Sequence, residues 1–133
     1  MSSVSKSIIC GRAFEFSRRV VRLCDRMATL GPSGRHIATE LTRAATSIGA
    51  NAEEAQDAQS RRDFIAKMCI ARKEAREALY WLRLAKAMQS GGQQDFDWEI
   101  NEAGELRAMI VAAVRTAQSH TSRGNPSTPR RLP

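Results

Sequence analysis

Apolar residues recur every three to four positions in four segments of this 133-residue chain, and this spacing limits the fold more than any other feature. Such spacing places the apolar side chains on one face of an α-helix. The segments span 12–30, 36–58, 61–89 and 97–120, and breakers such as Ser90-Gly91-Gly92 separate them. Four amphipathic helices joined by short loops predict an all-α fold, an antiparallel up-down four-helix bundle.

The apolar faces of these segments define the predicted core. The face of the second segment is mostly alanine, so a neighbouring helix can approach its backbone closely. Ser60 is the predicted N-cap of the third segment, with Asp63 placed as in a capping box, and Asp95 or Asp97 can cap the fourth. The predicted core residues, segment by segment, are Phe16, Val20, Leu23, Cys24 and Met27; Ile37, Leu41, Ala44, Ala45, Ile48, Ala52 and Ala55; Phe64, Met68, Ala71, Ala75, Ala78 and Leu82; and Leu106, Met109, Ile110, Ala113, Val114 and Ala117.

We expect the bundle to occupy residues 12–120, with an N-terminal arm over 1–11 and a disordered basic tail over 121–133. The tail holds three of the four prolines and three arginines but no acidic residue. No apolar run approaches the ~20 residues of a membrane span, and no apolar signal-peptide region precedes Cys10. The three cysteines are far apart and odd in number, which argues against a disulfide framework. These features predict a cytoplasmic protein.

The third segment carries a second row of residues away from its core-facing stripe. A helix in a four-helix bundle needs only one apolar face, so a second row would be exposed on a monomer. We interpret this row as the subunit interface of a homo-oligomer. The alternative is a helix that is more enclosed within its own bundle. The predicted interface residues are Ile70, Glu77, Trp81, Leu84 and Met88.

The net charge of +7 is divided unevenly among the segments. Segments 12–30 and 61–89 carry +3 and +5, whereas 36–58 and 95–120 carry −3 each, which favours contacts between basic and acidic helices. Rows of arginine at one-turn spacing match a nucleic-acid backbone, and the alternative is that they are solvated or paired with the acidic helices. The predicted nucleic-acid-binding residues are Arg12, Arg19, Arg22, Arg26, Arg62, Arg72, Lys73, Arg76 and Arg83.

Aromatic platforms for base stacking are lacking, because only Tyr80 is near the basic rows. We therefore expect RNA or DNA to be recognised by its backbone or shape. No catalytic or metal-binding spacing involves His36 or His120, and no glycine-rich loop has phosphate-binding spacing. We expect a protein that is not an enzyme and that uses no cofactor and no metal. The alternative is that the chain is a small hydrolase or a metal-binding bundle.

Residues 43–55 resemble the signature R-A-A-x-S-I-x-x-N-I-A-E-G of a family of small bacterial four-helix bundles, the 23S rRNA intervening-sequence proteins. A basic serine-containing turn followed by an acidic residue and phenylalanine comes next in that family, and Ser60-Arg61-Arg62-Asp63-Phe64 takes its place here. The matches cover about residues 9–87. Further matches are Arg12-Ala13, Ile70-Ala71 and Glu77. We expect a structural polar network of Arg43, Asn51, Glu53 and Glu77.

The chain departs from the family pattern at Cys10, Ala52 and Ala55, where Trp, Ile and Gly are usual. These departures and the arginine content resemble a divergent branch, the accessory variability determinant proteins of diversity-generating retroelements. That resemblance implies a basic homopentamer that binds nucleic acid and a reverse transcriptase. The expected function is therefore a nucleic-acid-binding oligomeric scaffold that assists a reverse transcriptase. The alternative is a protein-interaction scaffold of the intervening-sequence family with no direct nucleic-acid role.

Overall fold

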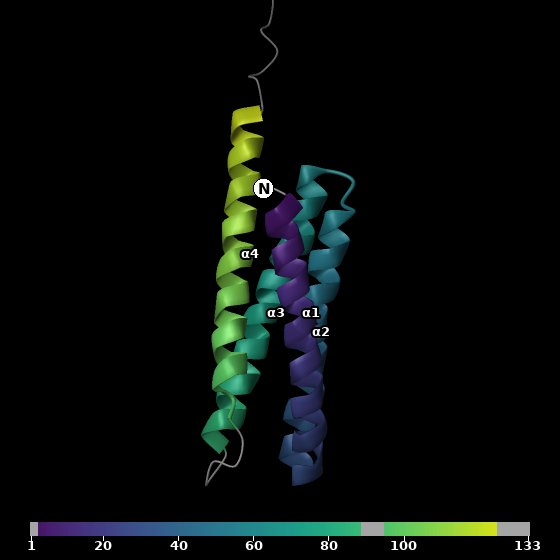
Figure 1. Cartoon of the computed structure of the whole chain (residues 1–133), viewed down its shortest axis with the longest axis vertical. Coiled ribbons are helices and arrows are strands. Elements are labelled where there is room, and N and C mark those ends of the chain that lie inside the picture. The colour runs from purple at the N-terminus through teal and green to yellow at the C-terminus, as the bar shows by residue number, and fades with distance from the viewer. Residues whose placement is uncertain (1–2, 89–94, 125–133) are drawn as a thin grey trace, which may run out of the picture.

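The computed structural model describes residues 3–88 and 95–124 and contains the predicted helices. They are α1 (Ser3–Met27), α2 (Pro32–Gln56), α3 (Arg61–Met88) and α4 (Asp97–Gly124), and a short 3-10 helix, η1 (Ala28–Leu30), follows α1. Figure 1 shows them as an up-down bundle in which consecutive helices run in opposite directions. The all-α four-helix prediction is confirmed.

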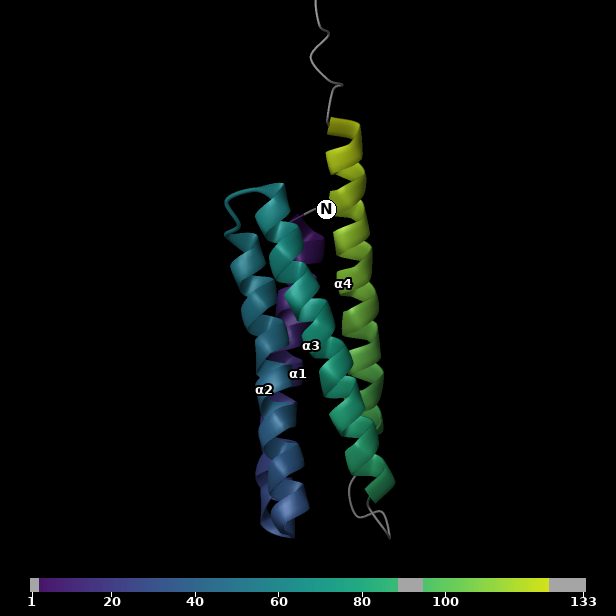
Figure 2. The same ribbon diagram turned by 180° about the vertical axis from the view of Figure 1, so that it is seen from behind.

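The helices contact one another around the bundle in chain order. α1 contacts α2 and α4, and α3 contacts α2 and α4, whereas α1 and α3 do not contact each other within the described residues. Figures 1 and 2, seen from opposite sides, both show α4 along one edge of the bundle. Each basic helix thus packs against the two acidic ones, as the charge distribution predicts.

The buried residues match the predicted core closely. All the predicted core residues are buried except Met109, which is half-buried. The core also includes Ile9, because α1 begins at Ser3 rather than at Arg12. The other buried apolar residues outside the predicted core are Ala13, Ala38, Ala85, Phe96 and Ala103. Ile9 lies four residues before Ala13 and seven before Phe16, and so continues the apolar stripe of α1 by two turns. Most of the expected N-terminal arm over 1–11 is therefore helical.

Two glycines determine how the chain turns from α1 into α2. Gly31 has a φ of 113°, a left-handed value that side chains other than glycine rarely adopt. A Cβ at Gly34 would collide with the main-chain oxygen of Met27, so α2 can pack against the end of α1 only with glycine there. Pro32 occupies the first turn of α2, where its missing N–H leaves no hydrogen bond unmade. α2 consequently begins before His36, the predicted start.

Side-chain caps define the beginnings of α3 and α4. Ser60 Oγ accepts a hydrogen bond from the Asp63 N–H at 3.0 Å, which confirms the predicted N-cap. Asp95 Oδ1 accepts one from the Asp97 N–H at 2.8 Å. α4 continues to Gly124, so the first residues of the predicted 121–133 tail are helical. The rest of that tail and the predicted breaker at 90–92 lie outside the described residues.

No helix in the described ranges is long and apolar enough to cross a membrane.

Candidate nucleic-acid interface

A groove between α3 and α4 gathers basic side chains from both helices. Its volume is about 500 Å³, and no acidic residue is among those that line it. α3 and α4 both contribute cations, and apolar or thiol side chains from each helix complete the lining. The lining residues are Cys69, Arg72, Lys73, Arg76, Arg107, Val111 and Arg115. We call this the α3–α4 groove.

The positive charge of the α3–α4 groove is not neutralised from within the chain. In the part of the chain that the structure describes, none of its five basic side chains forms an ion pair. Arg72 and Arg76 are one helical turn apart, and Arg107 and Arg115 are two turns apart, or about 12 Å along α4. A groove lined by charges of one sign concentrates counter-ions of the other, so this groove attracts polyanions.

The structure places the predicted α3 residues in two groups. Arg72, Lys73 and Arg76 line the α3–α4 groove, whereas Arg62 and Arg83 are exposed outside it. Arg107 and Arg115 were missed because segment 95–120 is acidic on average. Its five acidic residues all lie between 95 and 105, and its two arginines follow them. Arg107 and Arg115 are eight residues apart on one helical face, and this spacing could have indicated them from the sequence.

Arg12, another predicted contact, instead joins α1 to α4. Its Nε donates to Glu102 Oε2 at 3.0 Å, its Nη2 bonds both Glu102 and Glu105, and its Nη1 lies 3.4 Å from the sulfur of Met109. These bonds raise the pKa of Arg12 above its usual value and lower the pKa of the Glu105 carboxyl. Arg12 is thus engaged within the bundle, and its carboxylate partners compete with any phosphate.

Arg19 is also held by α4. Its guanidinium lies 3.8 Å from the centre of the Trp98 ring, and its Nη2 is 3.8 Å from Glu99 Oε1. Arg22 and Arg26 continue the row along α1, and neither forms an ion pair within the described residues. In the predicted α1 row, Arg12 and Arg19 therefore contact residues of α4, whereas Arg22 and Arg26 have no ion-pair partner among the described residues.

The predicted interface row on α3 is divided between the bundle and its surface. Trp81 and Leu84 are half-buried and pack against the core of the same chain, whereas Ile70 and Met88 are exposed. Trp81 Nε1 donates to Glu77 Oε1 at 3.5 Å, and its ring meets those of His36 and Tyr80 edge to face. Tyr80 is 56% exposed, so this aromatic cluster reaches the surface between α2 and α3.

Of the polar network expected from Arg43, Asn51, Glu53 and Glu77, the described residues show only the contact between Arg43 and Glu77. Arg43 binds Glu77 as well as Glu74, at 3.4 Å, and the negative charge of Glu77 is the main reason that the pKa of Arg43 is raised. Asn51 takes no part, because its Nδ2 donates to Ser47 O at 2.8 Å within α2. Glu74, buried on the core side of α3, was missed. Arg43 therefore ties α2 to α3 as Arg12 ties α1 to α4.

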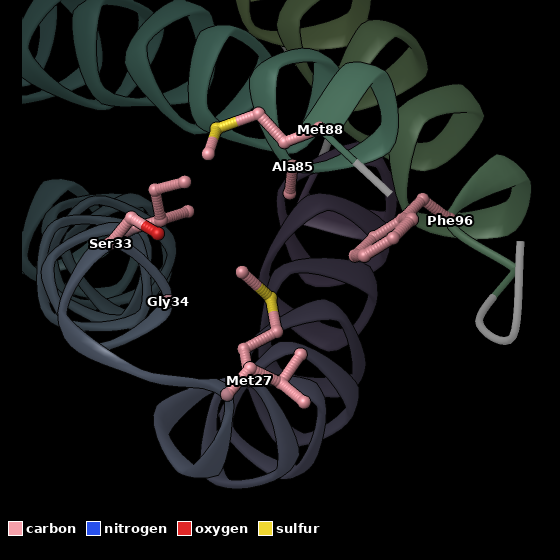
Figure 3. A pocket seen from close by; sticks show the side chains of 8 residues that line it. Met27, Ser33, Gly34, Ala85, Met88 and Phe96 are labelled. Atoms are coloured by element: carbon pink, nitrogen blue, oxygen red, sulfur yellow. The ribbon is translucent and has the colours of Figure 1, made fainter. Parts of the chain in front are cut away.

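Another pocket, of about 160 Å³, opens at the end of the bundle where α1 turns into α2. Figure 3 shows Met27 and Met88 pointing into it from α1 and α3, with Phe96 to one side and Ser33 opposite. Its lining includes no ionisable side chain, so the Ser33 hydroxyl has no general base beside it. Among the described residues, no group of three or more His, Cys, Asp or Glu side chains is placed to hold a metal ion.

Comparison with known proteins identifies relatives of the whole bundle. One solved structure, a protein of unknown function from the S23 ribosomal protein family of Bacteroides thetaiotaomicron, is 30% identical and superposes with a TM-score of 0.75. The match covers 84% of this chain and 98% of that chain. A search of curated proteins found no match. The family model described as the 23S rRNA-intervening sequence protein matches residues 5–112, and the chain belongs to that family.

Proposed function

We propose that this chain is a non-enzymatic nucleic-acid-binding protein that holds phosphates in the α3–α4 groove. The observation that carries the proposal is a groove that gathers five basic side chains, none of which forms an ion pair within the described residues, and that has no acidic residue in its described lining. Arginine binds phosphate through two parallel N–H donors, and four of the five cations are arginines. Release of counterions from the nucleic acid would drive the association.

The lining of the groove indicates which part of the nucleic acid is bound. No aromatic ring is among the lining residues, so bases have no stacking platform there. Basic side chains line both sides of the groove, because α3 supplies Arg72 and Arg76 and α4 supplies Arg107 and Arg115. This arrangement fits a strand whose phosphates lie between the helices, and binding would depend little on base sequence.

We further propose that the chain acts as an oligomeric accessory scaffold for a reverse transcriptase, as its resemblance to the accessory variability determinant branch implies. The surface of α3 supports self-association, because it exposes Ile70 and Tyr80, and the Tyr80 ring contacts that of the half-buried Trp81. In a homopentamer each groove would be repeated around the assembly, and the phosphate contacts would add. A protein-interaction scaffold with no nucleic-acid role is the second candidate, favoured by this same aromatic surface.

Fluorescence anisotropy with labelled RNA, DNA and RNA–DNA hybrid strands, titrated at several salt concentrations, tests the phosphate-binding role. We expect affinity to fall steeply with salt, and we expect the double variant Arg107→Glu/Arg115→Glu to bind at least about 100-fold more weakly. The matched control is Arg35→Glu/Arg61→Glu, which makes the same charge change at exposed positions outside the groove. Equal losses in the two double variants, or binding that ignores salt, would refute the groove as the binding surface.

Light scattering and co-purification test the scaffold role. Trp81→Asp should dissociate the oligomer, since it places a charge within the aromatic cluster. A mass that Trp81→Asp leaves unchanged would show that this surface is not the interface. Purification of the tagged chain from its native cell should recover a reverse transcriptase with its template RNA. Recovery of other proteins without nucleic acid would favour the protein-interaction scaffold.

A further inference from the structure

The carboxylate of Glu99 is the least satisfied polar group described in the bundle. Glu99 is 6% exposed, and its Oε2 is buried with no hydrogen-bond partner among the residues that the structure describes. Its Oε1 lies 3.8 Å from Arg19 Nη2, beyond hydrogen-bond distance. Glu102 and Glu105, one and two turns further along α4, both bind Arg12. Buried carboxylates without a donor are rare, so Glu99 is prepared for a partner that the described residues do not supply.

Glu99 lies in a second basic groove, between α1 and α4. The groove has a volume of about 220 Å³ and is lined by Arg18, Arg19, Arg22, Arg26 and Glu99. Arg18 is paired with Glu15, whereas Arg22 and Arg26 form no ion pair in the described ranges. The groove thus offers free cations beside an unsatisfied acceptor. A ligand that satisfies both must carry an anionic group and, a few ångströms away, a hydrogen-bond donor.

RNA carries these two groups on every nucleotide, because the 2′-hydroxyl lies next to the phosphodiester. DNA has the phosphate but lacks the hydroxyl. We propose that the α1–α4 groove binds a ribonucleotide unit, with Arg22 and Arg26 on its phosphates and the Glu99 carboxylate accepting a hydrogen bond from its 2′-hydroxyl. The inference rests on the proposed nucleic-acid role and adds selectivity for RNA over DNA to it.

Arg19 lies beside the Glu99 carboxylate. Oε2 is closed to solvent in the free chain, and Arg19 stacks on Trp98 without a hydrogen bond to Glu99. A phosphate in the groove would draw the Arg19 guanidinium outward and expose the carboxylate. The 2′-hydroxyl of RNA then supplies the missing donor, whereas with DNA the carboxylate loses its nearest cation and gains nothing. We expect RNA to bind roughly tenfold more tightly than DNA of the same sequence.

Three labelled single strands of one sequence test the inference with the full-length chain: RNA, 2′-fluoro RNA and DNA. The 2′-fluoro strand keeps the sugar geometry of RNA but has no hydroxyl donor. We expect wild type to prefer RNA over both of the others. Glu99→Leu, which removes the acceptor from a buried position, should bind all three alike, whereas Glu99→Gln keeps an amide oxygen and should retain part of the preference. Glu105→Leu is the matched control and should retain the whole preference, because Glu105 is already paired with Arg12.

The outcomes separate this inference from the proposed function. Wild type that binds RNA, 2′-fluoro RNA and DNA equally would overturn the RNA-selective groove and leave the phosphate-binding role standing. No binding to any strand would overturn the proposed function itself. Should Glu99→Leu fail to fold, Arg22→Gln/Arg26→Gln alters only exposed side chains and should also abolish the preference. A full preference for RNA in that double variant would contradict the inference.

Discussion

The two seams that flank α4 contain the same residue types in opposite arrangements. At Arg12 in the α1–α4 seam, the guanidinium faces Glu102 and Glu105, and these three charges are paired with one another. In the α3–α4 groove, Arg72 and Arg76 face Arg107 and Arg115, and no carboxylate lines the space between them. Arginines along a helix thus pair with carboxylates in one place and line an unpaired basic groove in the other. The neighbouring helix decides which of these two arrangements forms.

The electrostatic consequences differ as well. A paired arginine next to a buried carboxylate stabilises the fold, because removing it leaves that carboxylate without a donor. Facing arginines stabilise nothing by themselves, and their mutual repulsion is relieved only when an anion binds. The Arg12 contacts of the α1–α4 seam should therefore respond to mutation in stability, and the α3–α4 groove in binding.

Among single substitutions, the largest expected effect comes from placing a carboxylate in the groove. Val111 lies between Arg107 and Arg115, four residues from each, so Val111→Glu places a carboxylate within reach of both. We expect affinity for RNA and DNA to fall by about 10- to 100-fold, measured by anisotropy at fixed salt. Val111→Gln is the control, because glutamine has the shape of glutamate but carries no charge. If the glutamate and glutamine variants bind equally, the groove's charge is not what binds the nucleic acid.

Next in size is the loss of the Arg12 contacts. Arg12→Gln leaves Glu102, which is 8% exposed, without its guanidinium, and should lower the free energy of unfolding by about 1–2 kcal/mol. The corresponding change in the other seam, Arg115→Gln, should change it by no more than about 0.5 kcal/mol. Urea denaturation followed by circular dichroism measures both. A reversed order of the two effects would break the comparison between the seams.

Acid should weaken the α1–α4 seam in a defined pH range. Arg12 lowers the pKa of Glu105 in the folded chain, so the pair contributes stability that is complete above the unfolded pKa of about 4.3. That contribution is lost as the pH falls through the lower, folded pKa. We expect the urea midpoint of wild type to fall more steeply than that of Glu105→Gln below about pH 4.5. If the urea midpoints of the two proteins fall equally steeply with pH, the pairing of Arg12 with Glu105 is contradicted.

The smallest effect is expected at the ion pair that joins α3 to the beginning of α4. Lys86 Nζ lies 2.6 Å from Asp97 Oδ1, and both side chains are more than half exposed. Solvent screens such a pair, so Lys86→Gln should leave the urea midpoint unchanged within error. A loss as large as that from Arg12→Gln would show that exposure does not separate the strong contacts of this bundle from the weak ones.

Periodicity was enough to predict the bundle but not its charge pairing. The apolar stripes of the four segments predicted the helices and nearly all of the core, because burial follows directly from which face is apolar. Ile9 was missed because Ile8, Ile9 and Cys10 are consecutive, and three adjacent apolar residues show no helical period by themselves. Its place in the core is visible only once α1 is known to continue through it.

The candidate site depended on neighbours that a single sequence does not reveal. Arg12 and Arg76 belong to similar rows, and only the packing shows that Arg12 meets carboxylates while Arg76 meets other cations. The net charge of α4 is negative because of the acidic residues at its beginning, so the average over the helix did not indicate Arg107 and Arg115. The missing partner of Glu99 is a three-dimensional property and has no counterpart in spacing or composition.

The salt dependence of binding to one DNA duplex tests the difference between the seams most directly. Each phosphate contact that is lost should make the log–log slope of affinity against salt shallower by about 0.9. We predict that Arg76→Gln/Arg107→Gln reduces the steepness of the slope by about 2, whereas Arg12→Gln leaves the slope of wild type unchanged. A slope that becomes shallower in Arg12→Gln, or one that stays the same in the groove variant, would contradict the account.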